Sequence, residues 1–226
     1  EILEKNGAEI TYLPIDYNGN INLDDLEEAI RTDTILICLM HANNETGVVH
    51  PIEDIAKIAT KKNVLFFSDT TQAIGKIHTD YEKSGVDICC FSGHKLHGPK
   101  GIGTLYIRRK SRPIQIEPLI TGGKQENSFR GGTYDTAAIA GMGKAFEIAN
   151  PQDLKDLATL RDYFEDRIYN EIQDITIHAQ QATRLCNTSN IVFKHVKSAE
   201  LMPKLTNIAV SSGSACVSGD RDPSHV

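Results

Sequence analysis

Short apolar runs alternate with stretches of helical periodicity along the first two thirds of the chain. Helices are predicted at residues 23–30 and 51–62, where apolar side chains recur at helical spacing and Pro51 suits a first turn. Strands are predicted at residues 9–14, 34–40, 64–67, 86–91 and 103–107. The run at 34–40 is continuously apolar, as expected for a strand covered on both faces. The pattern predicts an α/β fold of βαβ units with a mostly parallel sheet.

The pattern changes after residue 137. Residues 137–149 and 151–174 are predicted to be helices, and the second of these begins at a proline. Three further strands are expected at residues 175–178, 190–193 and 207–211. We therefore expect a large domain over residues 1–149 and a smaller α+β domain over residues 150–226, with a hinge near Asn150 and Pro151.

Composition and charge exclude several classes of protein. The 226 residues carry 24 Lys and Arg against 30 Asp and Glu, a net charge of −6. That balance argues against binding nucleic acid or an anionic membrane surface, because both attract basic patches. No apolar run approaches the roughly 20 residues that cross a bilayer. The abrupt start and end lead us to expect a fragment of a longer protein.

The five cysteines form neither a C-x-x-C pair nor a zinc-like spacing, so no metal site is predicted. An odd count without a disulfide framework favours a reducing, cytoplasmic compartment. Cys38, Cys89 and Cys90 lie in apolar runs and are expected in the core. Cys216 lies in a loop of serine, glycine and alanine, which favours an exposed thiol.

Three polar segments follow directly on predicted strands, at residues 41–47, 69–72 and 92–95. Ligands of parallel α/β sheets bind beyond the carboxyl ends of the strands, so these segments should converge on one crevice. Lys95 stands there among glycine, serine and histidine. Taken alone it could be a surface lysine on a turn. At a strand end, partial burial would favour the neutral amine that forms an imine with a carbonyl group.

The motifs together resemble a known enzyme family. They are Asn44-Glu45-Thr46-Gly47, Asp69-x-x-Gln72, Ser92-Gly93-His94-Lys95, Arg130-Gly131-Gly132-Thr133 and Ser211-Ser212-Gly213-Ser214-Ala215-Cys216. In this order they resemble cysteine desulfurases of the NifS/IscS type, which belong to the class V aminotransferase group of fold-type I pyridoxal-phosphate enzymes. The resemblance runs through essentially the whole chain.

The resemblance implies that the cofactor is pyridoxal 5'-phosphate and assigns residues to it. Lys95 would hold the cofactor covalently and later move the substrate α-proton. Asp69 would pair with the protonated pyridine nitrogen, which keeps the ring an electron sink. Gln72 would hydrogen-bond the phenolic oxygen, and Asn44 would contact the cofactor or the substrate carboxylate. Without the resemblance, Asp69 could be a turn cap and Asn44 part of a simple turn.

The remaining implied roles concern the phosphate, the partner subunit and the sulfur. Ser92 and His94 would bind the cofactor phosphate, and Thr133 would reach the phosphate in the neighbouring subunit, which implies a homodimer. Cys216 would attack the sulfur of substrate L-cysteine and leave L-alanine and an enzyme persulfide. That sulfur would then pass to an acceptor protein or an iron–sulfur scaffold, for iron–sulfur clusters or for thiolation of tRNA and cofactors.

The chain departs from the family in several places, and other functions also remain open. The family's cofactor-stacking histidine would precede Glu1, its substrate-carboxylate arginine would follow Val226, and Gly131 stands where serine is common. A selenocysteine lyase or another class V aminotransferase would not depend on Cys216 for its main activity. A truncated chain could also act only as a binding or scaffold module.

Overall fold

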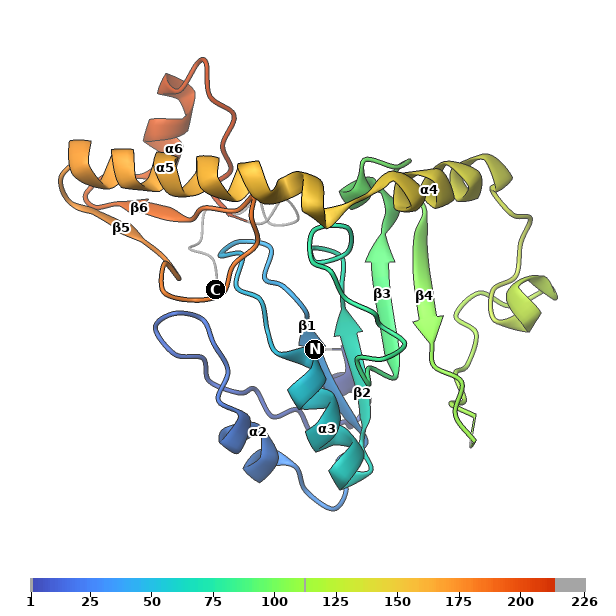
Figure 1. Ribbon diagram of the computed structural model, residues 1–226. Coiled ribbons are helices and arrows are strands. Elements are labelled where there is room, and N and C mark those ends of the chain that lie inside the picture. The colour runs from blue at the N-terminus through green and yellow to red at the C-terminus, as the bar shows by residue number, and fades with distance from the viewer. Residues whose placement is uncertain (1, 112, 214–226) are drawn as a thin grey trace. The chain divides into compact units, whose positions relative to one another are not determined.

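The computed structural model describes residues 2–111 and 113–213 (Figure 1). The chain forms two compact units. One comprises residues 32–41 and 51–152, and the other comprises the described parts of 1–31, 42–50 and 153–226. The passage between units at residues 152 and 153 lies close to the boundary expected at 149 and 150. Residues 42–50 group with the C-terminal part, although the sequence places them within the first domain. The domains 1–149 and 150–226 stay a prediction.

The unit of residues 32–41 and 51–152 is built on a four-stranded sheet. Its strands are β1 (Leu36–Met40), β2 (Leu65–Asp69), β3 (Ile88–Ser92) and β4 (Gly103–Ile107), in the order β1-β2-β3-β4. The pairs β1–β2 and β2–β3 are parallel, and β4 runs antiparallel at the edge, with its arrow reversed in Figure 1. The predicted α/β fold with a mostly parallel sheet is confirmed.

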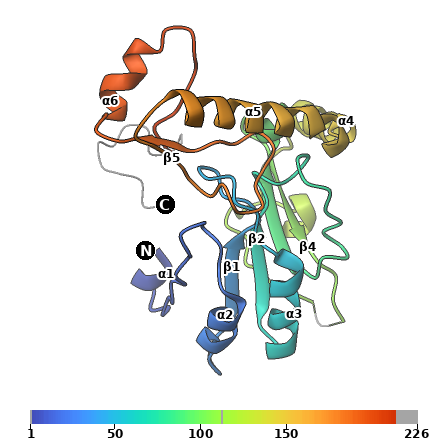
Figure 2. The same cartoon turned by 60° about the vertical axis from the view of Figure 1, so that its left-hand side comes forward.

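Helix α3 (Ile52–Lys62) packs on one face of this sheet beside β1 and β2 (Figure 2). It buries its apolar stripe of Ile52, Ile55, Ala56 and Ala59. The other face is exposed on its outer strands, since Leu36 of β1 and Leu105 of β4 remain 37% and 52% exposed. The expectation that strand 34–40 is covered on both faces is therefore wrong for the described chain.

Two helical segments complete this unit. Helix α4 (Thr136–Ile148) begins at Asp135, whose Oδ1 accepts a hydrogen bond from Ala138 N at 3.0 Å. The short helix η1 (Gly93–Leu96) follows β3 and packs against α4, and a further short helix, η2 (Gln125–Ser128), precedes α4. The end of β3 is thus held from the side by a long helix.

The other unit contains the elements α1 (Ile2–Lys5), α2 (Leu23–Ala29), α5 (Lys155–Glu171), β5 (Ile175–Ile177), β6 (Ile191–Phe193), α6 (Ser198–Leu201) and η4 (Met202–Lys204). Strands β5 and β6 form an antiparallel pair, and α5 packs on β5. A short helix, η3 (Pro151–Leu154), leads into α5, so the predicted helix over 151–174 is divided.

Two strand predictions are wrong. Residues 9–14 and 207–211 form no strand, and the isolated bridge between Ile15 and Ile21 lies just beyond the first of them. Both segments are largely exposed and have no described neighbour with which to form a ladder, and apolar character alone cannot supply one. The smaller α+β domain accordingly stays a prediction. Among the described residues, every helix is too short or too polar to cross a bilayer.

Candidate active site

Parallel pairing brings two of the predicted polar segments to the same edge of the sheet. Asp69, the last residue of β2, pairs with Cys90 of β3, and Ser92 ends β3 two residues later. The segments 69–72 and 92–95 therefore leave adjacent strands at their carboxyl ends, where α/β sheets bind ligands. This part of the predicted crevice lies within one compact unit.

Lys95 lies in the turn of η1, which is fixed by close packing around it. A Cβ on Gly93 would lie 3.0 Å from Ile102 Cγ2 and 3.1 Å from Met142 Cγ, so the backbone passes tightly between the residue that precedes β4 and helix α4. Leu96 is buried in a cluster with Ile74 and Ala145. Lys95 itself is half-buried, so a rigid base presents an amine that solvent and ligand can still reach.

Asp69 and Gln72 lie in the turn that follows β2. Oδ1 of Asp69 accepts a hydrogen bond from Thr71 N at 2.9 Å, and the carboxylate is exposed. Gln72 is half-buried, and its backbone oxygen accepts a hydrogen bond from Lys76 Nζ at 3.0 Å. Beyond β3, Ser92 is half-buried and His94 is exposed. A carboxylate, an amide, a hydroxyl, an imidazole and an amine thus occur on two neighbouring strand ends.

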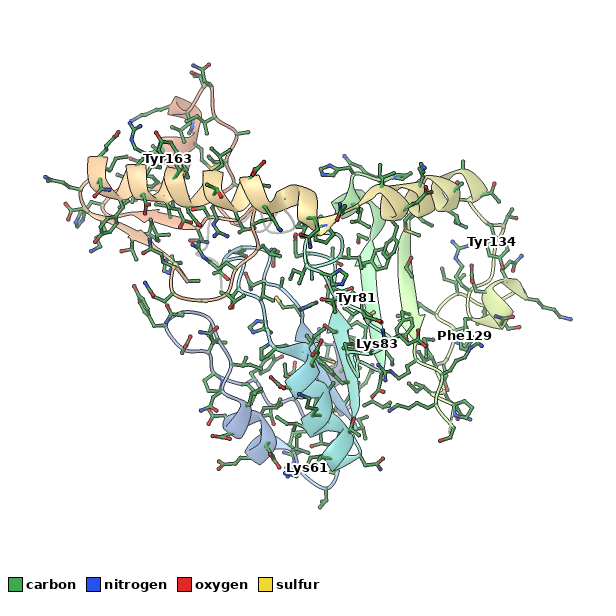
Figure 3. The ribbon with its side chains drawn as sticks, in the orientation of Figure 1. Lys61, Tyr81, Lys83, Phe129, Tyr134 and Tyr163 are labelled. Carbon is green, nitrogen blue, oxygen red and sulfur yellow. The ribbon has the colours of Figure 1, made fainter. Side chains whose placement is uncertain are left out.

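A polar pair that the sequence did not predict, buried His41 and partly buried Tyr81, lies next to the end of β2. Nδ1 of His41 lies 2.9 Å from the phenolic oxygen of Tyr81, which Figure 3 labels, and the two rings meet edge to face. Burial raises the pKa of Tyr81. The backbone N–H of His41 donates to Asp69 O at 2.8 Å, and Thr70 Oγ1 donates to Cys90 O at 2.8 Å. The sequence could have indicated His41, because it directly follows a predicted strand. No feature of the sequence around Tyr81 indicates that it contacts His41.

The other predicted site residues are not brought to this edge by any described contact. Asn44 is exposed in the loop 43–48 of the other unit. Thr133 is exposed and follows Gly131 and Gly132 on the approach to α4. Cys216 lies outside the described residues. The predicted convergence of all three strand-end segments therefore stays a prediction, and so do the roles of the site residues.

The whole chain, residues 1–226, matches the family described as aminotransferase class-V. The chain belongs to the class-V aminotransferases. Within this family it is similar to the cysteine desulfurase IscS of Dictyoglomus turgidum, with 44% identity over 99% of this chain and 57% of the relative. The chain thus spans little more than half the length of that class-V relative.

Solved structures share the fold of this chain. A NifS-like protein superposes with a TM-score of 0.86 at 38% identity, covering 93% of this chain and 58% of that one. The structure of SspA in complex with cysteine superposes with a TM-score of 0.79 at 35% identity, covering 96% and 60%. The sheet and its strand ends therefore belong to an architecture that this chain shares with these two proteins.

Class-V aminotransferases use pyridoxal phosphate, and the donor set at the strand ends fits this cofactor. Lys95 offers a reachable amine for its aldehyde, and Asp69 an exposed carboxylate for its pyridine nitrogen. Ser92 and Gln72 are half-buried hydrogen-bonding groups on the same two strand ends. The described residues hold no cluster of three or more histidine, cysteine or acidic side chains that would suit a metal ion instead.

Proposed function

We propose that the protein containing this chain is a pyridoxal-phosphate-dependent cysteine desulfurase. The observation that carries the proposal is the register that aligns Asp69 with the strand leading into Ser92 and Lys95. A carboxylate and an amine on neighbouring strand ends are the two groups that pyridoxal chemistry requires of a protein. The 44% identity to a cysteine desulfurase narrows the reaction from the family to sulfur removal.

Each site residue has a proposed task at the cofactor. Lys95 holds the cofactor through Nζ and then accepts and returns the α-proton of the substrate. Asp69 keeps the ring nitrogen protonated, so that the cofactor supplies an electron sink when bound. The phosphate is bound by Ser92 and His94, and by Thr133 from the neighbouring subunit of a homodimer. Gln72 binds the phenolic oxygen, and Asn44 orients the cofactor or the substrate carboxylate.

Cys216 carries the sulfur in this proposal. Its thiolate attacks the sulfur of L-cysteine, the carbon–sulfur bond of the substrate breaks, and that carbon gains a proton to give L-alanine. The sulfur stays on Cys216 as a persulfide, so all atoms of the substrate are accounted for. A sulfur-acceptor protein or an iron–sulfur scaffold then takes it. The described cysteines are all free thiols, which supports a reducing, cytoplasmic location.

The test is the reaction of the full-length protein with L-cysteine. We expect a yellow protein whose visible absorption is lost in Lys95→Ala, together with equal amounts of alanine and reductant-labile sulfur. Cys216→Ala should stop alanine release while the absorption remains. Cys186→Ala, which alters a half-buried thiol elsewhere, is the matched control and should stay active.

Two results would overturn the proposal. A full-length protein that binds no pyridoxal phosphate rules out the chemistry as a whole. Undiminished alanine release by Cys216→Ala rules out persulfide formation at that residue and favours a selenocysteine lyase or another class V aminotransferase.

A further inference from the structure

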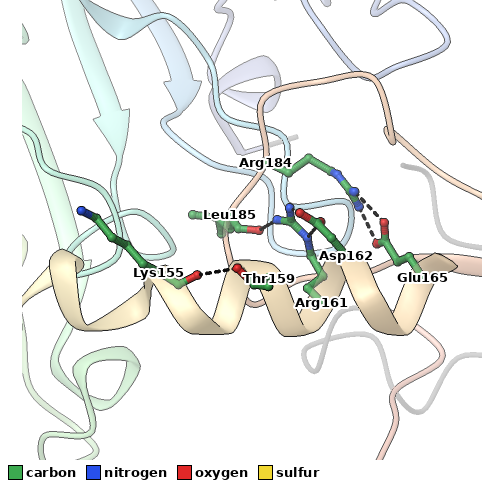
Figure 4. A network of polar contacts seen from close by, with 7 residues as sticks. All are labelled: Lys155, Thr159, Arg161, Asp162, Glu165, Arg184 and Leu185. Carbon is green, nitrogen blue, oxygen red and sulfur yellow. Dashed lines mark hydrogen bonds and ion pairs between the residues drawn. The ribbon is translucent and has the colours of Figure 1, made fainter. Parts of the chain in front are cut away.

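Glu165 and Arg184 form a buried ion pair that the proposed chemistry does not use. Arg184 donates from Nη1 to Glu165 Oε1 at 2.8 Å and from Nη2 to Oε2 at 2.7 Å (Figure 4). The two side chains are only 4% and 3% exposed. Removing two charges from water is costly, and this two-bond geometry offsets much of that cost. A well-packed apolar pair can often replace such a bridge without loss of stability, so its presence calls for another reason.

The pair connects helix α5 to one particular segment. Arg184 bridges Val48 in antiparallel fashion, with hydrogen bonds of 2.8 Å from Leu185 N to Gly47 O and from Val49 N to Thr183 O. A second link comes from Arg161 of α5, whose Nη1 donates to Leu185 O. Figure 4 shows Arg161 reaching from α5 to Leu185, and Arg184 reaching from this segment back to Glu165 on α5. The helix therefore fixes residues 183–185, and these in turn fix residues 47–49.

Residues 47–49 close the loop that carries Asn44. Asn43 N donates to Val48 O at 2.8 Å, and the Asn43 side chain accepts from the backbone N–H groups of Glu45 and Thr46 at 2.8 and 2.9 Å. Asn44 itself is exposed at the tip. These hydrogen bonds shape the backbone of the loop, and its exposed residue is the one to which the proposed function assigns a task.

Two further contacts hold the loop against the segment after Arg184. Gly47 has φ +79°, and a Cβ there would lie 2.8 Å from Thr188 Cβ, so the backbone must pass close to Thr188. Asn190 Nδ2 donates to Glu45 O at 3.4 Å. All of these residues belong to one compact unit.

We propose that Glu165 and Arg184 are positioning residues that hold the loop of Asn44, the residue to which the proposed function gives a contact with the cofactor or the substrate carboxylate. This inference rests on the proposed function, because the task of Asn44 comes from it. The pair touches neither cofactor nor substrate in this proposal. The pair acts through residues 183–185 and 47–49. Its loss should therefore change the position of Asn44.

The test compares three variants of the full-length protein: Glu165→Gln, Asn44→Ala and their combination. Glu165→Gln should raise the KM for cysteine and the Kd for pyridoxal phosphate by about 10-fold each, typical of coupling within one network, with kcat changed less than KM. The combination should be no worse than Asn44→Ala alone. If the fold-increases in KM and Kd of the two single variants multiplied in the combined variant, the proposal would be overturned. Glu171→Gln, in the exposed pair with Arg167 on the same helix, is the matched control and should leave both constants unchanged.

A second variant separates positioning from stability. Glu165→Met combined with Arg184→Met replaces the ion pair with apolar side chains, which often preserves folding. We expect this variant to melt near the parent temperature while the KM and Kd defects persist. Recovery of both constants along with stability would show that the pair is only structural, and the proposal would fail.

Hydrogen exchange tests the inference independently of the proposed function. In Glu165→Gln, backbone amides of residues 43–49 should exchange faster, while amides of β5 and β6 keep their protection. If the parent protein lacks desulfurase activity but Glu165→Gln shows this selective change relative to it, the proposed function fails and the positioning of the loop stands. Uniform change over both regions, or none, would overturn the positioning role itself.

Discussion

The imidazole of His41 and the phenol of Tyr81 meet edge to face, with Nδ1 and Oη 2.9 Å apart and ring centroids 5.8 Å apart. His41 follows β1 directly, and its backbone N–H donates to Asp69 O at the end of β2. Tyr81 lies 40 residues further along the chain. The contact thus links the residue that follows β1 to the segment between β2 and β3, and His41 is also hydrogen-bonded to the last residue of β2.

Tyr81→Phe removes the hydroxyl from this contact and leaves a buried imidazole nitrogen without that partner. We expect the free energy of unfolding to fall by about 1–3 kcal/mol, the usual range for stranding a buried polar group. Urea unfolding followed by circular dichroism measures it. Tyr169→Phe, at a tyrosine that is 62% exposed, is the control and should change stability by less than about 0.5 kcal/mol. Equal losses in the two variants would contradict the assignment.

Gly75 governs the packing next to Lys95. Its φ is +72°, and a Cβ there would lie 2.3 Å from Leu96 Cδ2. Gly75→Ala therefore combines backbone strain with overpacking, and we expect a loss of about 2–4 kcal/mol. Thermal unfolding measures the change.

Gly143 supplies the matched control for this substitution. It lies within α4, and a Cβ there would meet nothing within 4 Å. Gly143→Ala should stabilise the protein by about 0.5–1 kcal/mol, because alanine is the better helix former. If Gly75→Ala raised the melting temperature as Gly143→Ala is expected to, the tight packing of Leu96 against Gly75 would be refuted.

Alkaline pH should destabilise the fold through Cys89. Burial raises the pKa of this thiol from its ordinary 9.0 to about 11. The unfolded chain therefore loses its proton at a lower pH than the native state does, so stability is full below pH 9 and declines between about pH 9 and 11. The decline attributable to Cys89 is on the order of 2–3 kcal/mol. Unfolding free energies at pH 8 and pH 10.5 should differ less in Cys89→Ala than in the parent; identical differences would exclude Cys89 as the cause.

Part of the fold could be predicted because buried parallel strands leave a direct record in the sequence. The runs at 64–67 and 86–91 are apolar because both lie inside the sheet, and the structure places strands within two residues of them. The run at 207–211 is similarly apolar but forms no strand. A strand forms only where another segment pairs with it. Whether such a segment lies nearby depends on distant parts of the chain and not on the run itself.

In the candidate site, too, some features could be predicted from the local sequence and others could not. Ser92 and Lys95 follow an apolar run without interruption, so their place at a strand end could be predicted from local pattern. The side-chain pairs His41–Tyr81 and Glu165–Arg184 could not be predicted in this way. Glu165 and Arg184 are 19 residues apart, and each looks like an ordinary surface charge in its own segment. Their burial arises from the packing of α5 against residues 183–185, which no local periodicity records.

Asp69→Asn tests whether Asp69 acts on the cofactor through its charge or only caps the turn after β2. Oδ1 of Asp69 accepts the 2.9 Å hydrogen bond from Thr71 N, and the amide oxygen of asparagine can accept the same bond. The turn and the stability should therefore be preserved. Only the negative charge opposite the proposed pyridine nitrogen is lost, so kcat for desulfuration should fall about 100-fold or more. Asp69→Ala loses both features and should reduce stability as well. Full activity of Asp69→Asn in the full-length protein would reduce Asp69 to a turn cap, because a cap needs the oxygen and not the charge.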